Sequence, residues 1–268
     1  MWRYVTLLYR VLDMEYLITA YSDIGIKKRT NQDSMFIKVA ETEYGKVCFS
    51  VLCDGMGGLA KGELASASII RDFSKWFEYE FPEMLYKGIN PENLRKTWEN
   101  LIYESNYKIG YYSQHHNAQM GSTVSALLIV DGIYYIIHVG DSRIYLLDNT
   151  IKQLTKDQTF IQQEMDAGRM TPEEARRDPR RNMLLQCVGA SNVIEPDFYL
   201  GEIQENSVFA ICSDGFRHVI TEEEIYAGLN PSISYNETIM YDNAVSLVEL
   251  NKSRQEEDNI SVALVRVT

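Results

Sequence analysis

Five aspartates lie at the ends of apolar segments that have the pattern of β-strands. They are Asp33, Asp54, Asp141, Asp214 and Asp258. Asp54 and Asp214 are each followed by glycine, whose missing side chain lets a main-chain carbonyl approach a ligand closely. Because strand ends in a sheet sandwich can meet at one rim, these distant residues can share one site. Oxygen-only clusters suit hard cations, so the pattern indicates a site for magnesium or manganese.

Each aspartate alone is also typical of an ordinary turn. Asp-Gly is a common turn pair, and aspartate at a strand end often caps a loop. Five of them together, each beside a strongly apolar segment, favour a shared site over five separate turns. No Ser-His-Asp or Cys-His arrangement is evident, so the chemistry does not point to a nucleophilic side chain.

Composition excludes several functional classes. The formal net charge is −12, which is unsuited to neutralising the phosphates of a nucleic acid. No segment reaches the roughly 18 to 20 apolar residues that span a bilayer, so we expect no membrane partner. The four cysteines form no C-x-x-C pair and lie mostly in apolar runs. They are therefore expected to be free, buried thiols in a reducing compartment, which predicts a cytoplasmic protein.

The elements that must position the aspartates are arranged as strands, two helices, more strands, and then helices before a last strand. Alternating or continuous apolar runs predict strands at residues 16–23, 34–41, 46–54, 122–132, 133–141, 142–149, 196–203, 207–215 and 259–267. Helical patterns lie at residues 62–81, 90–112, 221–229 and near 241–252. Helices that are segregated from sequential strands favour an α+β layered fold over a doubly wound one.

Local signals predict how these segments begin and end. Pro82 is expected to stop the first helix, and Asn90 to cap the second with Pro91 at its first position. No linker or repeat divides the chain. We therefore expect one domain over residues 16–268, preceded by an extension of unknown role at residues 1–15.

Seven segments resemble, in order, motifs of the metal-dependent protein phosphatase 2C family. They are SDIGIKKRTNQDS, CDGMGG, GSTVSALLI, HVGDSRIY, LTKDQ, ICSDGF and DNISVALV. The chain is most similar to the bacterial branch, and the resemblance runs from about Tyr16 to the C-terminus. One D-G-M-G-G segment would be weak support, whereas seven motifs in the same order are strong support. The resemblance implies a four-layer αββα sandwich, with two antiparallel sheets flanked by helices.

The resemblance also implies an activity. Family members remove phosphate from phosphoserine and phosphothreonine in proteins, using a water or hydroxide that bridges two magnesium or manganese ions. By motif match, Asp54 bridges both ions and the Gly55 carbonyl binds one of them. Asp214 and Asp258 complete the other side, and Asp33 binds directly or through water.

Two further positions follow from the same resemblance. Asp141 matches the residue that holds, with Asp214, a third and weaker ion. Lys28 stands where the family has an arginine that grips the phosphate, and Arg29 follows it. Lysine supplies the charge without the bidentate fork, so Lys28 or Arg29 could serve. We assign Lys28 to the catalytic group with Asp54 and Asp214.

For several further residues, the functional and the structural interpretation have to be weighed. Met56 stands where eukaryotic relatives have a histidine that protonates the leaving group, so a metal-bound water is the alternative acid. His218 lies four residues after Asp214, as either a bystander or a residue lining the site. His138 lies in an apolar strand and is expected to be a core histidine. The segment 155–191 is expected to form a flap. Its basic cluster, EARRDPRRN, is either solvated or a docking surface for acidic phosphopeptides.

Three functions compete at this point. The leading one is a monomeric Ser/Thr phosphatase acting on phosphorylated proteins, which opposes a Ser/Thr protein kinase and includes that kinase among its partners. A pseudophosphatase that binds phosphoproteins without turnover is the second, and Lys28 is the feature that favours it. The third is a hydrolase of small phosphate esters.

Overall fold

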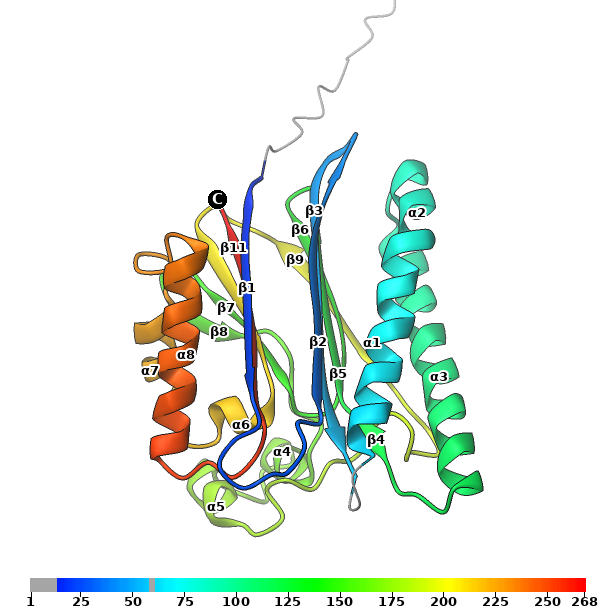
Figure 1. Ribbon diagram of the computed structural model, residues 1–268, viewed down its shortest axis with the longest axis vertical. Coiled ribbons are helices and arrows are strands. Elements are labelled where there is room, and N and C mark those ends of the chain that lie inside the picture. Colours follow the sequence, from blue (N-terminus) through cyan, green and yellow to red (C-terminus); the bar gives the residue numbers. More distant parts are fainter. Residues whose placement is uncertain (1–13, 58–60) are drawn as a thin grey trace, which may run out of the picture.

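The structure, a computed structural model, describes residues 14–57 and 61–268. Two antiparallel sheets lie face to face, and helices cover the outer side of each sheet (Figure 1). The predicted four-layer αββα sandwich is therefore confirmed. The expected N-terminal extension lies almost wholly outside the described residues.

One sheet has five strands, and each pair of neighbours is antiparallel. Its order is β1 (Tyr16–Asp23), β11 (Ile260–Val267), β10 (Ser207–Cys212), β7 (Arg143–Leu147) and β8 (Ile151–Gln153). Its outer face carries the helices α6 (Asp214–Arg217), α7 (Glu222–Leu229) and α8 (Glu237–Ser253). Apolar residues of α7 and α8 pack on those of the sheet in one cluster, so this half has its own helix-covered core.

The second sheet faces the first across the middle of the molecule. Its order is β2 (Asp33–Thr42), β3 (Gly45–Met56), β5 (Val124–Val130), β6 (Ile133–Val139) and β9 (Asp197–Glu202), with the short β4 (Gly121–Ser122) pairing to β3. The helices on its outer face are α1 (Gly62–Tyr79), α2 (Phe81–Lys87) and α3 (Pro91–His115).

Strand β3 explains why its sequence is apolar without alternation. Phe49 and Val51 pack in the cluster beneath α1 and α3, whereas Cys48 and Leu52 pack in the cluster between the two sheets. Successive side chains point to opposite faces of a strand, and here both faces are buried. A continuous apolar run is therefore what this position requires.

The expectation that Pro82 stops the helix is wrong in part. Helix α1 ends at Tyr79, but α2 begins at Phe81 with Pro82 in its first turn. Proline is tolerated there because a first-turn N–H has no partner within the helix. The predicted cap of α3 is confirmed, since Asn90 Oδ1 accepts a hydrogen bond from the Asn93 N–H at 3.0 Å.

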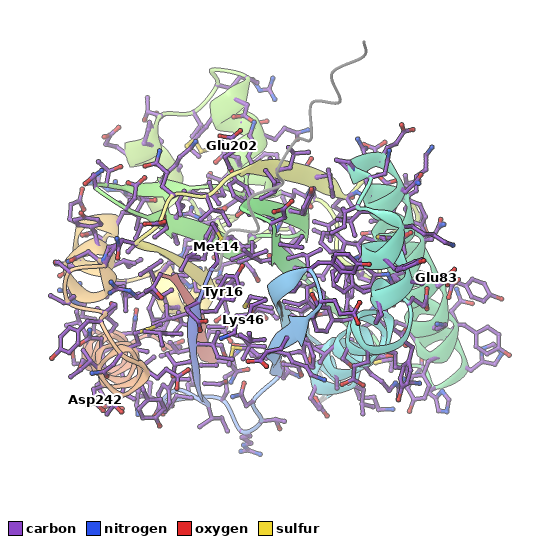
Figure 2. The ribbon with its side chains drawn as sticks, turned by 90° about the horizontal axis from the view of Figure 1, so that it is seen from above. Met14, Tyr16, Lys46, Glu83, Glu202 and Asp242 are labelled. Carbon is purple, nitrogen blue, oxygen red and sulfur yellow. The ribbon has the colours of Figure 1, made fainter. Side chains whose placement is uncertain are left out.

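The two ends of the sandwich differ. The flap segment, residues 155–191, carries α4 (Phe160–Asp166) and α5 (Pro172–Arg177) at the lower end in Figure 1, near α6. Met14, Tyr16 and Lys46 lie at the upper end, which Figure 2 shows from above. Within the described ranges, no helix combines the length and apolarity that a membrane crossing requires. All four cysteines are free and buried, as predicted.

Candidate metal centre

The five predicted aspartates come from both sheets to the lower rim of the sandwich. Asp33 opens β2 and lies directly opposite Asp54 of β3 in the antiparallel register. Asp214 opens α6 just after β10, and Asp258 precedes β11 by two residues. Asp141 lies between β6 and β7. Pairing of β10 with β11 and of β2 with β3 places these aspartates at the strand ends, and packing of the two sheets then brings residues more than 200 positions apart together, as the Gln32–Asn259 hydrogen bond shows.

Burial and mutual repulsion disfavour the charged forms of these carboxylates. Burial raises the pKa of Asp54 well above its usual value, and the other four aspartates, Asp33 first, raise it further. The pKa of Asp33 is raised to about 7, mainly by burial and then by Asp214 and Asp258. Asp141 is likewise raised to about 7 by burial and by Asp214. A nearby cation would favour the ionised forms, so the rim is suited to bind one.

Asp33 carries the clearest sign of a missing partner. Both of its carboxylate oxygens are buried, and neither has a hydrogen-bond partner of normal geometry. The hydroxyls of Ser213 and Ser261 lie near enough to lower its pKa, but each has a partner of its own. Ser213 Oγ accepts from the Ser261 N–H at 3.0 Å, and Ser261 Oγ lies 2.7 Å from Ser22 Oγ. A buried carboxylate without partners is costly, and a hard cation would satisfy it.

The carboxylates lie close enough to raise one another's pKa values, but they do not converge into a ligand set. In the part of the chain that the structure describes, no three carboxylate, thiol or imidazole groups converge closely enough to hold a metal ion. A cation is present instead as a side chain, because Lys28 Nζ lies 2.5 Å from Asp258 Oδ1. Burial would lower the pKa of Lys28, but Asp258, and then Asp54 and Asp214, raise it. Arg29 forms no such ion pair within the described ranges, so of these two neighbours Lys28 is the one that pairs with a rim aspartate.

Gly55 is required by a close approach of main chains. A Cβ atom at this position would lie 2.3 Å from the Gly62 carbonyl oxygen and 2.5 Å from that of Gln32. Both main-chain polar groups of the neighbouring Asp54 are hydrogen-bonded. Its N–H donates to Thr123 Oγ1 and its carbonyl accepts from Ser122 Oγ, both at 2.9 Å. The glycine therefore lets the end of β3 pass beside the start of α1, and it fixes where Asp54 stands.

The comparison with known proteins decides the family. The family model described as "Protein phosphatase 2C" matches residues 26–243. The chain belongs to the protein phosphatase 2C family. Protein phosphatase PhpP of Streptococcus pneumoniae is 29% identical over 251 residues, covering 92% of this chain and 96% of that protein. Membership confirms the expectation of a serine/threonine protein phosphatase.

Solved structures agree with that assignment. The serine/threonine phosphatase of S. agalactiae is 31% identical with a TM-score of 0.81, over 95% of this chain and 100% of that chain. The catalytic domain of the serine/threonine protein phosphatase PstP, solved with two manganese ions, is 28% identical with a TM-score of 0.77. That match covers 95% of this chain and 99% of the other. That relative therefore holds two manganese ions in a fold that this chain shares.

Asn259 is a positioning residue that the sequence reading missed, although it lies in the quoted DNISVALV motif. Its Oδ1 accepts from the Gln32 N–H at 2.9 Å, and its Nδ2 donates to the carbonyls of Ile24 and Thr30 at 3.0 and 3.2 Å. These bonds tie the loop before β2 to the start of β11. The loop carries Lys28, so one buried amide places both Lys28 and the first residue of β2.

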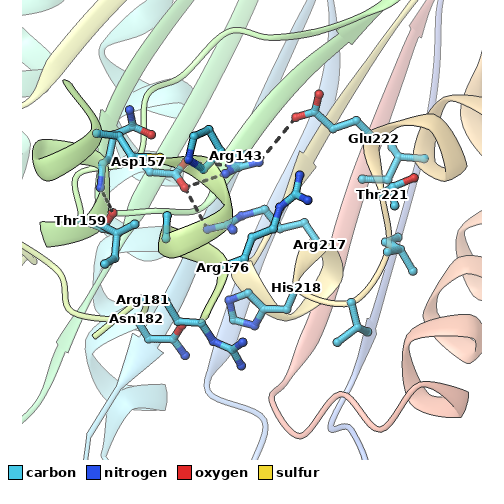
Figure 3. Close-up of a pocket in the computed structure, with 18 of the residues that line it drawn as sticks. Arg143, Asp157, Thr159, Arg176, Arg181, Asn182, Arg217, His218, Thr221 and Glu222 are labelled. Atoms are coloured by element: carbon cyan, nitrogen blue, oxygen red, sulfur yellow. Dashed lines mark hydrogen bonds and ion pairs between the residues drawn. The ribbon is translucent and has the colours of Figure 1, made fainter. Parts of the chain in front are cut away.

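A buried network of arginines and aspartates was also missed. Arg217 donates to the Asp141 carbonyl at 2.8 Å and lies 3.3 Å from Asp157 Oδ2. Arg143 makes two bonds of 2.8 Å to the carboxylate of Asp157. Asp157 lies in the LTKDQ motif, Asp141 and Arg143 lie in HVGDSRIY, and Arg217 directly follows ICSDGF. Figure 3 shows the side chains of Arg143, Asp157 and Arg217 meeting beside the cavity. In the sequence, the signal that could have pointed to this network is the charged residue within or directly after each of these motifs.

The positions of His218 and His138 show which interpretation of each histidine is correct. His218 lines the rim, with Nε2 at 3.3 Å from Asp214 Oδ2 and Nδ1 at 3.5 Å from Glu256 Oε2. Burial would lower the pKa of His218, but Asp214 and Glu256 raise it. His138 is a core histidine, as predicted: it is fully buried and bonded to Ser125 Oγ and to the Gly140 carbonyl.

Proposed function

We propose that this phosphatase hydrolyses phosphoserine and phosphothreonine in proteins with the help of two divalent cations, manganese or magnesium. The proposed ligands are Asp33, Asp54, the Gly55 carbonyl, Asp214 and Asp258, and Asp141 with Asp214 would hold a third ion weakly. The observation that carries the proposal is the buried Asp33 carboxylate, which lacks a hydrogen-bond partner of normal geometry and lies near Asp54, Asp214 and Asp258. When bound, two such ions would activate a bridging water for attack and offset the charge that develops on phosphorus.

The chain's own residues would position the substrate and the acids. Asp33, Asp214 and Asp258 would turn toward the ions from three different elements, while Asp54 stays fixed by its main-chain bonds. Lys28, released from Asp258, would supply positive charge to the phosphate. Lysine binds phosphate as a point charge, so this contact lacks the two parallel bonds that an arginine makes.

A pseudophosphatase remains the second candidate, because one observation favours it. Lys28 Nζ already forms an ion pair with Asp258, one of the proposed metal ligands. A tethered ammonium there would compete with metal and weaken turnover. Against this reading, all of the proposed acidic ligands are present, which a protein without catalysis has no reason to keep.

The first test is metal-dependent turnover. We expect manganese-dependent release of phosphate from a phosphothreonine peptide, abolished by EDTA and insensitive to okadaic acid. Asp214→Asn should lower kcat at least about 10²- to 10³-fold, because it removes a charge that acts in the transition state. The matched control is Asp242→Asn, an exposed residue of α8, which should behave as wild type. Near-normal turnover of the Asp214 variant would contradict the assignment of Asp214 as a metal ligand.

The second test concerns Lys28. Lys28→Arg should lower KM for a phosphopeptide by about threefold to tenfold, because arginine offers a bidentate grip at the same position. Arg29→Lys is the control and should leave KM unchanged. If Lys28→Arg has no effect on KM while Arg29→Lys raises it, the phosphate contact belongs to Arg29.

We further propose that the enzyme works in the cytoplasm as a monomer and opposes a Ser/Thr protein kinase. Four buried free thiols support a reducing compartment. The measurement is dephosphorylation of an autophosphorylated Ser/Thr kinase by the purified protein, with the mass in solution determined by light scattering. A kinase that keeps all of its phosphate would count against this pairing.

A further inference from the structure

A second basic site lies beside the aspartate rim. A cavity of about 690 Å³ separates the flap from the segment that joins α6 to α7. Four arginines line it: Arg143, Arg176, Arg181 and Arg217. Figure 3 shows these side chains around the pocket, with Arg176 and Arg181 contributed by the flap. Such a gathering of positive charge is unusual in a protein with a net charge of −12.

Two of the arginines, Arg143 and Arg217, already pair with carboxylates that line the cavity. Arg143 makes its paired bonds to Asp157, and its Nη1 lies 3.6 Å from Glu222 Oε1. Arg217 lies 3.3 Å from Asp157 and binds the Asp141 carbonyl. These arginines therefore hold the wall together, and Nε of Arg217, which has no hydrogen-bond partner in the described residues, is buried.

The two flap arginines are different. Within the described ranges, neither Arg176 nor Arg181 forms an ion pair or a side-chain hydrogen bond, and both are exposed. Arg176 lowers the pKa of Glu223 only as the last of several causes, after hydrogen bonds at the start of α7. By contrast, the nearby Arg180 is held by Asp178 and lies over the Phe160 ring. Arg176 and Arg181 thus offer unused guanidinium groups at a concave surface.

The cavity shares a wall with the aspartate rim. Arg217 and His218 both line the cavity. On their other side, Arg217 contacts Asp141 and His218 contacts Asp214. A ligand in the cavity would therefore lie next to a substrate phosphate at the rim, on the side where α6 ends.

We propose that this cavity binds an anionic side chain of the protein substrate, a carboxylate or a second phosphate, that lies near the phosphorylated residue. The inference rests on the proposed function, since it names which phosphoproteins that site would prefer. Arg176 and Arg181 are the recognising residues, because a planar guanidinium fork matches both carboxylate and phosphate. Recognition of acidic motifs by arginine clusters is a recurring mode of peptide binding.

The test compares substrates that differ only beside the phosphothreonine. One peptide carries flanking glutamates, one a second phosphorylated residue, and one only alanines, and p-nitrophenyl phosphate serves as a substrate without flanks. The double variant Arg176→Gln, Arg181→Gln should raise KM for either acidic peptide about threefold to tenfold, with kcat unchanged. KM for the alanine peptide and for p-nitrophenyl phosphate should not move. A larger effect on one acidic peptide would identify carboxylate or phosphate as the preferred group.

The matched control is Arg177→Gln. Arg177 is the neighbour of Arg176 on α5, is also exposed and does not line the cavity. The single variant Arg176→Gln is measured beside it. If Arg177→Gln raises KM as much as Arg176→Gln does, or if KM of the double variant rises equally for the alanine peptide, the effect is general surface charge and the proposal is overturned.

A binding measurement separates this proposal from the proposed function. Calorimetry with the glutamate-flanked peptide in EDTA reports the cavity without turnover. Weaker binding by the double variant, with Arg177→Gln unchanged, would support the cavity even if no peptide were hydrolysed. Equal binding by wild type and double variant would overturn it even if the enzyme proved active.

Discussion

At the level of single residues, the rim depends on side chains that do no chemistry themselves. Asp157 is buried and receives two guanidinium groups, from Arg143 and Arg217. Burial would raise the pKa of Asp157, but Arg217 and then Arg143 lower it to about 2. Arg217 in turn binds the carbonyl of Asp141, so the charge of Asp157 indirectly fixes a proposed metal ligand.

The low pKa of Asp157 predicts acid sensitivity. In the unfolded chain an aspartate titrates near a pKa of about 3.9. The folded value lies below that, so the ionised pair contributes stability above about pH 4 and loses it as pH falls toward about 2. The contribution is on the order of 2 kcal/mol. Urea unfolding of wild type at pH 7, 4 and 3 should show this loss.

Asp157→Asn isolates the effect. At pH 7 the variant should be less stable by about 3–5 kcal/mol, because two buried cations lose their partner. Its free energy of unfolding should fall less steeply than that of wild type between pH 4 and 3. Asp242→Asn, on an exposed helix face, should keep the wild-type slope. The same slope in both variants would contradict the assigned pKa.

At the level of elements, the loop between β1 and β2 matters most, because it carries Lys28 into the rim. Nothing in its own sequence gives it regular structure. Its shape comes from contacts with the strand end opposite, where Asn259 holds three of its main-chain groups. Gly25 lies in the left-handed region, and a Cβ there would meet the Asp258 carbonyl oxygen at 2.2 Å. The loop and the start of β11 are therefore one unit.

Removal of the Asn259 amide should loosen this unit. Asn259→Ala is expected to lower the free energy of unfolding by about 2–3 kcal/mol, since buried main-chain groups lose their partners. KM for a phosphopeptide should rise as well, because Lys28 is no longer held in place. Asn149→Ala, at an exposed turn, should change stability by less than about 0.5 kcal/mol. An Asn259 variant with lower stability and unchanged KM would separate the loop from substrate binding.

At the level of the whole molecule, the rim joins the two halves of the sandwich. Its aspartates come from both sheets, and their repulsion opposes the packing of one sheet on the other. A cation that binds only the folded arrangement would replace this repulsion with attraction to the carboxylates. Its effect on stability then follows mass action.

Manganese should therefore stabilise the fold measurably. At about 100 times its dissociation constant it adds about 2.7 kcal/mol, which corresponds to a rise in Tm of roughly 5–10 °C for a chain of this size. EDTA should remove the shift. Asp33→Asn should diminish it, whereas Asp242→Asn should show it in full. Melting curves of wild type that do not respond to manganese would argue against a metal centre at this rim.

The sequence by itself determined the layers of the fold and the family. Alternation and apolar runs are local properties, and they located the strands that lie beside Asp54, Asp214 and Asp258. Asn90 marked the start of α3 because a cap acts within one turn. The aspartates could also be named as candidate ligands from the sequence, because the motifs that contain them are recognised by their order along the chain, without knowledge of tertiary contacts.

Only the tertiary structure decided which side chains meet. Lys28 faces Asp258 while Arg29 does not, and Arg217 lies between Asp141 and Asp157. Pro82 opens a helix instead of ending one, because its ring suits a first turn. The contacts of Lys28 and Arg217 depend on strand register and on how the two sheets stack. Both are set by packing between residues far apart in the chain, and no local pattern encodes them.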